Sequence, residues 1–321
     1  MSDVFLPYPI IAGPTASGKT ALAIQLAKQL NGEVVSADSM QIYGDVSVGT
    51  ARPTIEEMDG IPHHLMGFLP LQEKYSVARY LEDADHVFCD IYARKKTPVM
   101  CGGTGLYIQS FMENIQLFDQ QPDPDFRAEM QRFATEQGEE ALHARLREVD
   151  PESAERLHPH DIHRVIRALE VYQTTGHTIG EQTRLSHGQP SRYSPYLFVL
   201  DFRDRQVLYN RINRRVDIML ENGLLEEAQR ILHTDRDATV TQAIGYKEFE
   251  AYFSGEISMQ AAADRLRQQT RRYAKRQLSW FRRMSNAEVL YVDETENVDE
   301  LTCKAIELYR KFVERGRKYA P

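Results

Sequence analysis

One eight-residue segment constrains the fold of this chain more than any other. Residues 13–20 match the pattern GxxxxGK[ST] in full, with an apolar strand before them at residues 9–12 and good helix formers after them. A strand, this pattern and then a helix form the context of a P-loop. The predicted phosphate-binding residues are Gly13, Pro14, Thr15, Ala16, Ser17, Gly18, Lys19 and Thr20.

The chemistry of such a loop follows from its geometry. Glycines let backbone N–H groups turn inward around phosphate oxygens, and the N-terminus of the following helix adds partial positive charge. We expect Lys19 to reach the outer phosphate and the Thr20 hydroxyl to hold Mg²⁺. In NTPases an acid after a second strand usually helps to hold the metal. Here the strand that ends at Cys101 is followed by Gly102-Gly103-Thr104, although Asp38 and Asp201 end other strands. The ligand is therefore either a nucleotide or a small diphosphate, and the loop alone favours a kinase.

Strand and helix patterns alternate along most of the chain. Further strands are predicted at residues 33–38, 65–69, 98–101, 196–201 and 288–292, and helices at 76–95, 204–221, 224–232, 265–283 and from 298 onward. This alternation predicts an α/β fold whose parallel sheet has helices on both faces. Residues 125–185 are charged, helical in pattern and poor in strand signals. We therefore expect a core of residues 1–114 and 195–321, with an inserted helical domain at 115–194.

Charge is segregated along the chain. The net charge is −8, yet residues 265–283 hold eight Lys and Arg and no acid, so the remainder carries about −16. This segregation predicts a basic, nucleic-acid-binding helix face on an acidic body, unless the face is simply solvated. Arg265, Arg272, Lys275 and Arg283 can share its polar face, while Leu266, Tyr273, Trp280 and Phe281 can pack on the body.

Other features limit the compartment and the chemistry. No apolar run is long enough for a membrane span, and the N-terminus has no basic region typical of a secretory signal. The three cysteines are far apart, which favours buried thiols in a reducing compartment, so we expect a cytoplasmic protein. The histidines at 63–64, 158, 160 and 163 lack cysteine partners and regular ligand spacing, and no zinc site is expected.

Several polar residues are candidates for the reaction itself. Asp38 ends a strand, where α/β sheets form their ligand crevice, and could act as a general base or cap the next turn. Thr104 also follows a strand, and its hydroxyl could face that crevice or cap the next helix. Arg211 and Arg215 lie four residues apart on one helix face, so either could clamp a diphosphate or remain solvated.

Several segments together resemble the tRNA dimethylallyltransferases, also called tRNA isopentenyltransferases. These segments are residues 13–20, Asp38-Ser39-Met40-Gln41-Ile42-Tyr43, Gly49-Thr50-Ala51-Arg52-Pro53, Gly102-Gly103-Thr104-Gly105-Leu106-Tyr107, residues 164–170, residues 242–248 and residues 270–277. The resemblance spans residues 8–293 and fits the bacterial form, because no C-terminal zinc finger follows. It implies a P-loop kinase-like core that binds dimethylallyl diphosphate with Mg²⁺ and transfers the prenyl group to the exocyclic amine of the adenosine 3′ to the tRNA anticodon.

The resemblance also implies roles for individual positions. Asp38 would be the general base, Thr104 would lie near the reacting groups, and Arg127, in the loop that opens the insertion, would contact tRNA or the reaction centre. From the pattern on its helix, rather than from the resemblance, Arg215 is predicted to join residues 13–20 in binding the diphosphate. The positions that would contact the tRNA anticodon stem-loop are Asp38, Ser39, Met40, Gln41, Ile162, His163, Arg164, Val165, Ile166, Arg167, Gln242, Ala243, Ile244, Gly245, Tyr246 and Lys247. The charge pattern of the basic helix adds Arg272, Lys275 and Arg276 as predicted contacts with the tRNA backbone.

Two other functions compete with this one. A P-loop small-molecule kinase would use Asp38 as the base on a hydroxyl, but it needs no extended cationic face. A nucleic-acid-binding ATPase would use the basic helix without any transferase activity. We expect a monomeric enzyme with no membrane partner, and thermal shifts with ATP or dimethylallyl diphosphate would distinguish the three.

Overall fold

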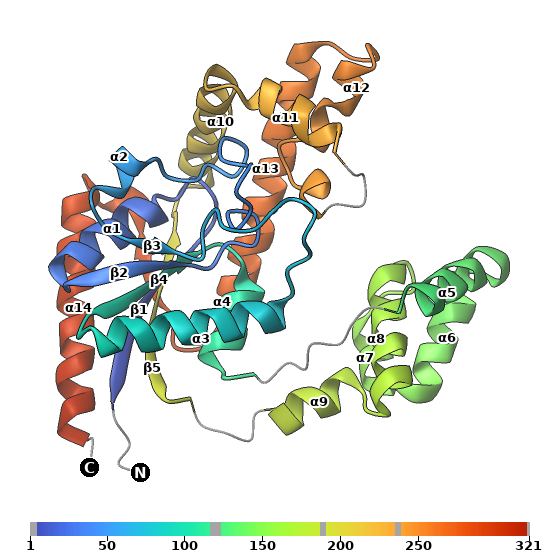
Figure 1. Ribbon diagram of the computed structural model, residues 1–321, viewed down its shortest axis with the longest axis horizontal. Helices are drawn as coiled ribbons and strands as arrows, with labels where there is room; N and C mark the ends of the chain where they lie inside the picture. The colour runs from blue at the N-terminus through green and yellow to red at the C-terminus, as the bar shows by residue number, and fades with distance from the viewer. Residues whose placement is uncertain (1–4, 116–122, 187–190, 235–238, 320–321) are drawn as a thin grey trace. The chain divides into compact units, whose positions relative to one another are not determined.

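A computed structural model of the protein describes residues 5–115, 123–186, 191–234 and 239–319 (Figure 1). Within these residues six strands form one sheet in the order β3-β2-β4-β1-β5-β6, and every neighbouring pair is parallel. The strands are β1 Leu6–Ala12, β2 Gly32–Ser36, β3 His63–His64, β4 Thr97–Gly102, β5 Tyr193–Asp201 and β6 Glu288–Tyr291. The carboxyl ends of β2, β4 and β1 are neighbours, so the loops that follow them meet at one edge of the sheet.

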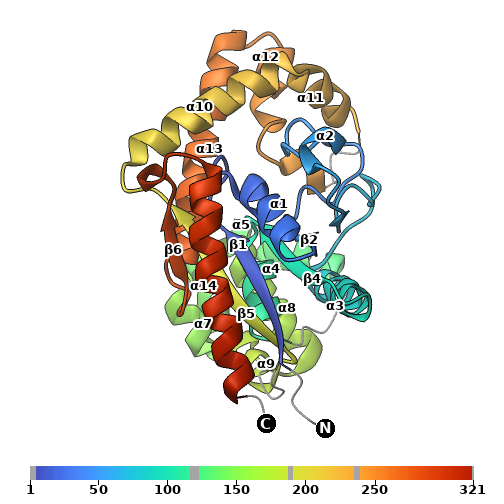
Figure 2. The ribbon, with the colours of Figure 1, turned by 90° about the vertical axis from the view of Figure 1, so that its left-hand side faces the viewer.

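Helices cover both faces of the sheet, as predicted. The helices of this part of the chain are α1 Lys19–Gln29, α2 Ile55–Met58, α3 Val77–Ala93, α4 Gly105–Met112, α10 Arg205–Glu221, α11 Leu224–Leu232, α12 Glu250–Phe253, α13 Met259–Phe281 and α14 Val298–Tyr319, with short 3₁₀ turns η1 Thr239–Gln242, η2 Lys247–Phe249 and η3 Val292–Glu294. Alternation along β1 explains the two layers. Tyr8, Ile10 and Ala12 pack under α3 and α4, whereas Ile11 packs under α1 and α14, which lie side by side in Figure 2.

A third apolar cluster supports the loops beyond the sheet. It joins α10, α11, η2 and the first half of α13 to the polar segment that follows β2. From this segment come Ile42, Tyr43 and Val46, which are at most 1% exposed. Helix α13 continues past α10 toward α4 and the sheet (Figure 1). One long helix therefore contacts both the outer cluster and the sheet edge.

The chain divides into two compact units, residues 1–112 with 192–321 and residues 113–191. The second unit consists of α5 Pro124–Gln137, α6 Glu139–Val149, α7 Pro151–Arg156, α8 Ile162–Thr175 and α9 Ile179–Ser186. It has its own core, in which Leu142, Leu146 and Val165 are fully buried. The boundaries expected from the sequence, after residues 114 and 194, fall within three residues of this division.

The structure corrects several local expectations. The strand expected at residues 65–69 is instead the pair His63–His64, because Leu65 and Gly67 adopt positive φ and only a bridge between Tyr43 and Leu69 remains. Arg127 lies in the first turn of α5 rather than in a loop, since Asp123 caps that helix. Of the cysteines only Cys101 is buried.

None of the helices in the described part of the chain combines the length and apolar character of a membrane span.

Candidate active site

The P-loop after β1 is shaped by its own backbone and by neighbouring side chains. Gly18 adopts φ +92°, a conformation that strains any residue with a Cβ, immediately before α1 begins. Pro14 has no N–H, and the Thr15 N–H donates to the Gln277 Oε1 at 2.9 Å. The Ser17 hydroxyl is buried and has no hydrogen-bond partner within the described residues. An unpaired buried hydroxyl in a glycine-rich loop is consistent with a polar ligand such as phosphate.

Lys19 turns back over this loop. Its ammonium donates to the Pro14 carbonyl oxygen at 2.8 Å. Part of its surface is exposed, but the pKa of its ammonium is lowered to about 8. Burial is the main cause and Arg215 contributes, while Cys101 and Asp38 oppose the shift. A cation held in a partly dehydrated loop gains much from an anionic ligand, because the anion favours its charged form.

Asp38 and Thr104 lie in loops that follow adjacent strands and are joined through Ser39. The Thr104 hydroxyl accepts from the Ser39 N–H at 2.9 Å and donates to the Ser39 hydroxyl at 3.3 Å. It therefore ties two loops together. The Asp38 Oδ1 accepts from the N–H groups of Met40 at 3.0 Å and Gln41 at 3.3 Å. Asp38 thus caps its own turn with one oxygen while its charge raises the pKa of Lys19 and Arg215.

The two arginines of α10 have different surroundings. Arg211 Nε donates to the carbonyl oxygen of Ala16 at 2.9 Å, so it braces the P-loop from outside. Arg215, one turn further along, is half-buried, and this burial lowers its pKa while Asp38 raises it. Arg215 also lowers the pKa of Lys19. Of the two candidates for the diphosphate clamp, Arg215 is therefore the one that lies in the electrostatic range of both Lys19 and Asp38.

Asp201 is committed to a structural contact. This buried carboxylate at the end of β5 forms a bidentate pair with Arg282, with Nε–Oδ2 at 2.9 Å and Nη2–Oδ1 at 3.0 Å, and also accepts from the Phe202 N–H. Of the two acids that the sequence offers beside the loop, Asp38 alone interacts with Lys19. Within the described residues, no group of three His, Cys, Asp or Glu side chains is arranged to hold a metal ion.

A buried carboxylate that sequence reasoning missed organises the loop after Asp38. Glu227 on α11 accepts from the N–H groups of residues 47, 48 and 49 at 2.9, 3.1 and 2.7 Å, and from the Tyr246 hydroxyl at 2.9 Å. Burial alone would raise its pKa, but these hydrogen bonds lower it below the ordinary value. Gln41 Nε2 then donates to the carbonyl oxygens of Thr50 and Ala51. The segment 38–51 is thereby held from α11.

This arrangement corrects one part of the predicted tRNA-binding set. Tyr246 is fully buried, so its side chain supports the loop at residues 47–49 and does not face a partner. Ala243 and Ile244 are half-buried, Gly245 is buried and Lys247 is exposed, while the side chain of Gln242 lies outside the described residues.

The cations of α13 and of the residues that follow it separate into two groups. Arg267 pairs with Asp217 and Asp264, and Arg282 pairs with Asp201, so these charges are neutralised within the chain. The three predicted tRNA contacts, Arg272, Lys275 and Arg276, are exposed and form no ion pair within the described residues. Arg276 lies 5.6 Å from the ring centre of Tyr273, whose pKa is raised by burial and by Asp38. The expected body-facing residues Leu266 and Phe281 are buried, but Trp280 is 37% exposed.

In the inserted unit, four predicted residues surround one surface hollow. Arg127, His163, Ile166 and Arg167 line a cavity of about 520 Å³ between α5 and α8. Both arginines pair with the buried Glu170, at 2.7 Å from Arg127 and 2.6 Å from Arg167. Burial would raise the pKa of this carboxyl, but the two guanidinium groups lower it to about 2. The hollow thus combines two fixed cations with one histidine.

The remaining predicted residues of α8 point in different directions. Ile162 is half-buried, and Arg164 is exposed and pairs with Asp161. Val165 is fully buried in the core of its unit, so its side chain is not exposed to a partner in this structure. A continuous run cannot face one partner, because successive side chains of a helix are rotated by about 100°.

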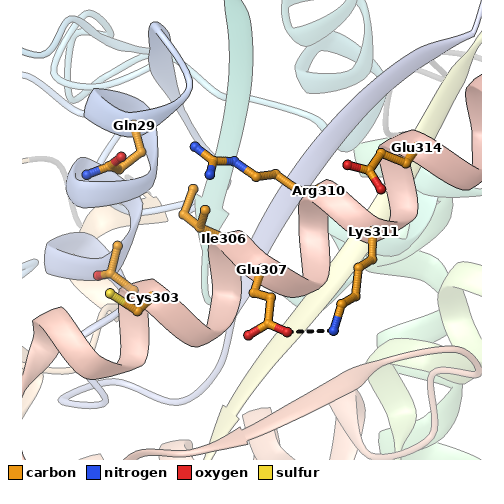
Figure 3. Close-up of a pocket in the computed structure, with 8 residues that line it drawn as sticks. Gln29, Cys303, Ile306, Glu307, Arg310, Lys311 and Glu314 are labelled. Atoms are coloured by element: carbon orange, nitrogen blue, oxygen red, sulfur yellow. Dashed lines mark hydrogen bonds and ion pairs between the residues drawn. The ribbon is translucent and has the colours of Figure 1, made fainter.

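Another hollow, of about 510 Å³, lies away from this chemistry. It is formed by the C-terminal end of α1 and by α14, where Gln29, Cys303 and Arg310 line it (Figure 3). Lys311 pairs there with Glu307. Lys19 and the P-loop lie at the opposite, N-terminal end of α1, so this hollow is not part of the candidate active site.

Comparison with known proteins identifies the family. The model of the IPP transferase family matches residues 41–284. The chain belongs to the IPP transferase family. It is 45% identical to a tRNA dimethylallyltransferase of Thermoanaerobacter sp. (strain X514), over 91% of this chain and 94% of that one. A tRNA dimethylallyltransferase of Bacillus cereus (strain AH187) is 46% identical over 91% and 92%.

Solved structures of the family agree with the fold. The tRNA isopentenylpyrophosphate transferase of Bacillus halodurans matches with a TM-score of 0.73 and 40% identity, covering 98% of both chains. A eukaryotic dimethylallyltransferase acting on tRNA matches with a TM-score of 0.79 and 29% identity, over 96% of this chain and 80% of that one. The chain is therefore a prenyl-transferring enzyme with the fold of the tRNA isopentenyltransferases.

Proposed function

We propose that this enzyme transfers the dimethylallyl group of dimethylallyl diphosphate to the exocyclic N6 of the adenosine 3′ to the tRNA anticodon. The observation that carries the proposal is the meeting of three loops at the carboxyl edge of β1, β2 and β4. The first loop carries the Lys19 ammonium, the second the Asp38 carboxylate and the third the Thr104 hydroxyl. Such an arrangement suits a diphosphate leaving group beside an acceptor that must lose a proton.

The donor diphosphate would lie in the P-loop. Lys19 and Arg215 supply cations, the N–H groups of the first turn of α1 supply donors, and the Ser17 hydroxyl, which has no partner among the described residues, gains one. The Thr20 hydroxyl and the phosphate oxygens offer the oxygen ligands that Mg²⁺ prefers. When bound, Mg²⁺ would neutralise charge that develops on the leaving diphosphate.

Asp38 would act on the acceptor. As the new bond forms between N6 and the terminal allylic carbon, the bond from that carbon to the diphosphate oxygen breaks. The leaving diphosphate takes the electron pair, and Asp38 takes the proton that N6 must lose. Ser39 and Thr104 hold the Asp38 turn against the loop after β4, which keeps the base at the edge shared with the P-loop.

The tRNA would be bound by cationic side chains that lie outside the candidate active site. Arg272, Lys275 and Arg276 form an exposed row on α13, and Arg127 and Arg167 are fixed by Glu170 in the inserted unit. Guanidinium groups suit phosphate oxygens, so both surfaces fit an RNA backbone. The target adenosine would leave its stack to reach the crevice, which an unpaired loop allows at lower cost.

The proposal includes a monomer that acts in the cytoplasm, where its tRNA substrate would be found. The large apolar side chains exposed on the described surface come from separate segments, such as Ile55, Phe68 and Phe253, and this scatter supports a monomer. Light scattering at working concentrations tests the oligomeric state, with a mass of about 37.0 kDa expected.

Nucleoside analysis tests the reaction directly. Unmodified tRNA is incubated with the enzyme, Mg²⁺ and dimethylallyl diphosphate, then digested and analysed by mass spectrometry. N6-(dimethylallyl)adenosine is expected at the position 3′ to the anticodon, with none when ATP replaces the donor. Thermal shifts provide the contrast with a kinase, because a bound ligand raises the melting temperature. Stabilisation by ATP alone, with no modified nucleoside, would contradict the proposal.

A further inference from the structure

Helix α13 carries one buried amide among apolar neighbours. Gln277 is 6% exposed and lies between Ala274, Leu278 and Phe281, which are all buried. A glutamine on the buried face of a helix requires hydrogen bonds, because an unsatisfied buried amide is costly. Its two polar atoms find partners in two different loops.

Gln277 bridges the loop after β1 and the loop after β4. Its Oε1 accepts from the Thr15 N–H at 2.9 Å, and its Nε2 donates to the Gly103 carbonyl oxygen at 2.9 Å. The bridge needs a glycine at 103, since a Cβ there would stand 2.2 Å from the Gln277 amide nitrogen. The residue that follows is Thr104, whose hydroxyl holds the Asp38 turn through Ser39. One amide therefore connects the phosphate loop to the loops that carry the candidate base.

We propose that Gln277 is a positioning residue, which sets the separation between the loop that holds the donor diphosphate and the loops that hold the acceptor side of the reaction. The inference rests on the proposed prenyl transfer. The hydrogen bond to Gly103 is buried and the one from Thr15 is partly buried, so water does not replace the Gly103 bond when the amide is removed. Reaction between two bound groups depends steeply on their separation, and a misplacement of about 1 Å can lower a rate by roughly 10²-fold.

The first experiment removes the two hydrogen bonds and keeps the size of the side chain. In Gln277→Met, we expect the single-turnover rate of prenyl transfer, with tRNA and dimethylallyl diphosphate saturating, to fall by roughly 10²-fold. The dissociation constant for tRNA, measured by filter binding, should stay within about threefold of wild type, because the exposed cations of α13 are unchanged. Gln268→Met is the matched control, since Gln268 is exposed on the same helix and should leave the rate unaltered.

The second experiment makes the bridge depend on pH. The carboxylate introduced by Gln277→Glu can accept from the Thr15 N–H, but it has no proton for the Gly103 carbonyl oxygen. Protonation restores that donor, and both burial and the facing carbonyl raise the pKa of the introduced carboxyl. The rate of Gln277→Glu relative to wild type should therefore rise by at least about tenfold as pH falls from about 8.5 to 6, whereas Gln277→Met should keep a constant deficit.

These outcomes separate a positioning role from a general loss of structure. A folded Gln277→Met that transfers within about threefold of the wild-type rate overturns the proposal, and so does a Gln277→Glu deficit that is the same at every pH. The pH experiment remains decisive even when Gln277→Met is unstable. If the melting temperature of Gln277→Glu is constant from about pH 6 to 8.5, a change in its folding cannot explain a rise in its rate at low pH. A wild-type enzyme that yields no prenylated adenosine contradicts the proposed function itself, which is a different result.

Discussion

Asp38 serves two purposes that one substitution can separate. Its Oδ1 holds the turn through Met40 and Gln41, a task that needs an acceptor but no charge. Its proposed role in catalysis needs a basic oxygen. Asparagine keeps the acceptor and tolerates the same turn, but it cannot take a proton at neutral pH.

In Asp38→Asn we therefore expect folding and tRNA affinity close to wild type and a loss of roughly 10²–10⁴-fold in the single-turnover rate. Rapid quench with saturating tRNA measures the rate, and filter binding measures the affinity. Asp59→Asn is a suitable control, because Asp59 lies on the surface and pairs with Lys28. A rate for Asp38→Asn within about threefold of wild type would remove Asp38 from the role of base.

The lowered pKa of Lys19 leads us to expect that the affinity for the donor depends on pH. With a pKa lowered to about 8, its ammonium is charged below pH 8 and neutral above it in the free enzyme. Since the diphosphate binds the cation, the affinity for dimethylallyl diphosphate without RNA should be level below pH 7 and fall by roughly tenfold per pH unit well above 8. Calorimetry near pH 8 should also detect proton uptake on binding.

Lys19→Arg provides the control for this titration, because arginine keeps its charge throughout the range. The decline above pH 8 should disappear in this variant, whatever its absolute affinity. If wild type and Lys19→Arg show the same profile, another group titrates and Lys19 does not contact the diphosphate.

At the scale of elements, the spacing of residues in α13 predicts a basic amphipathic helix, and the exposed row of cations agrees with that pattern. What spacing cannot supply is the partner of Gln277, since Thr15 lies 262 residues away. The helix does contain a signal, because Gln277 falls on the same face as Ala274 and Phe281, where a polar residue implies a specific hydrogen bond. Glu227 on α11 escapes prediction for the same reason, as its partners at 47–49 are remote in sequence.

Local backbone also limits the prediction of elements. The pattern of residues 65–69 resembles a strand, but positive φ at Leu65 and Gly67 interrupts it. The strands next to β1 are predicted correctly from the sequence, because buried parallel strands are continuous apolar runs. The fold is thus accessible from periodicity, whereas the contacts that shape the site depend on side chains brought together by folding.

The exposed row of α13 predicts a salt-dependent contribution to RNA binding. Replacing Arg272, Lys275 and Arg276 together with Gln should weaken tRNA binding and flatten the slope of log affinity against log salt by roughly 0.7–0.9 for each phosphate that the variant no longer neutralises. Donor affinity should not change. Filter binding across a salt series tests the slope.

The matched control replaces Lys304, Arg310 and Lys311, three exposed cations of α14. This change alters net charge equally and should leave the slope as in wild type. An unchanged slope in the α13 variant would mean that its cations are only solvated and that tRNA binds elsewhere.

At the scale of the whole molecule, the two units have separate cores. Among the residues that the structure describes, the clusters around β1 and the outer cluster of α10–α13 contain none of 113–191, and the core of the inserted unit contains none from outside it. The candidate donor site lies entirely in the larger unit.

Replacing residues 113–191 with a flexible Gly/Ser linker should therefore leave a folded protein that binds dimethylallyl diphosphate within about threefold of wild type. The same protein should not prenylate tRNA, because the arginines at 127 and 167 are removed with the insertion. Calorimetry and nucleoside analysis measure the two effects. Loss of donor binding in a protein that still melts cooperatively would show that the insertion completes the donor site.

The long-range hydrogen bonds of the site have a consequence for synthesis on the ribosome. A nascent chain of about 200 residues already contains the P-loop and Asp38, but it lacks Glu227 and Gln277, whose side chains hold these loops. Domains fold as their residues emerge, so strands β1 to β4 can pair before the catalytic edge is fixed, whereas β6 follows Gln277 in sequence and joins the sheet later. The active geometry is then acquired in the last part of translation, when α11 and α13 leave the exit tunnel, and prematurely terminated chains are left without it.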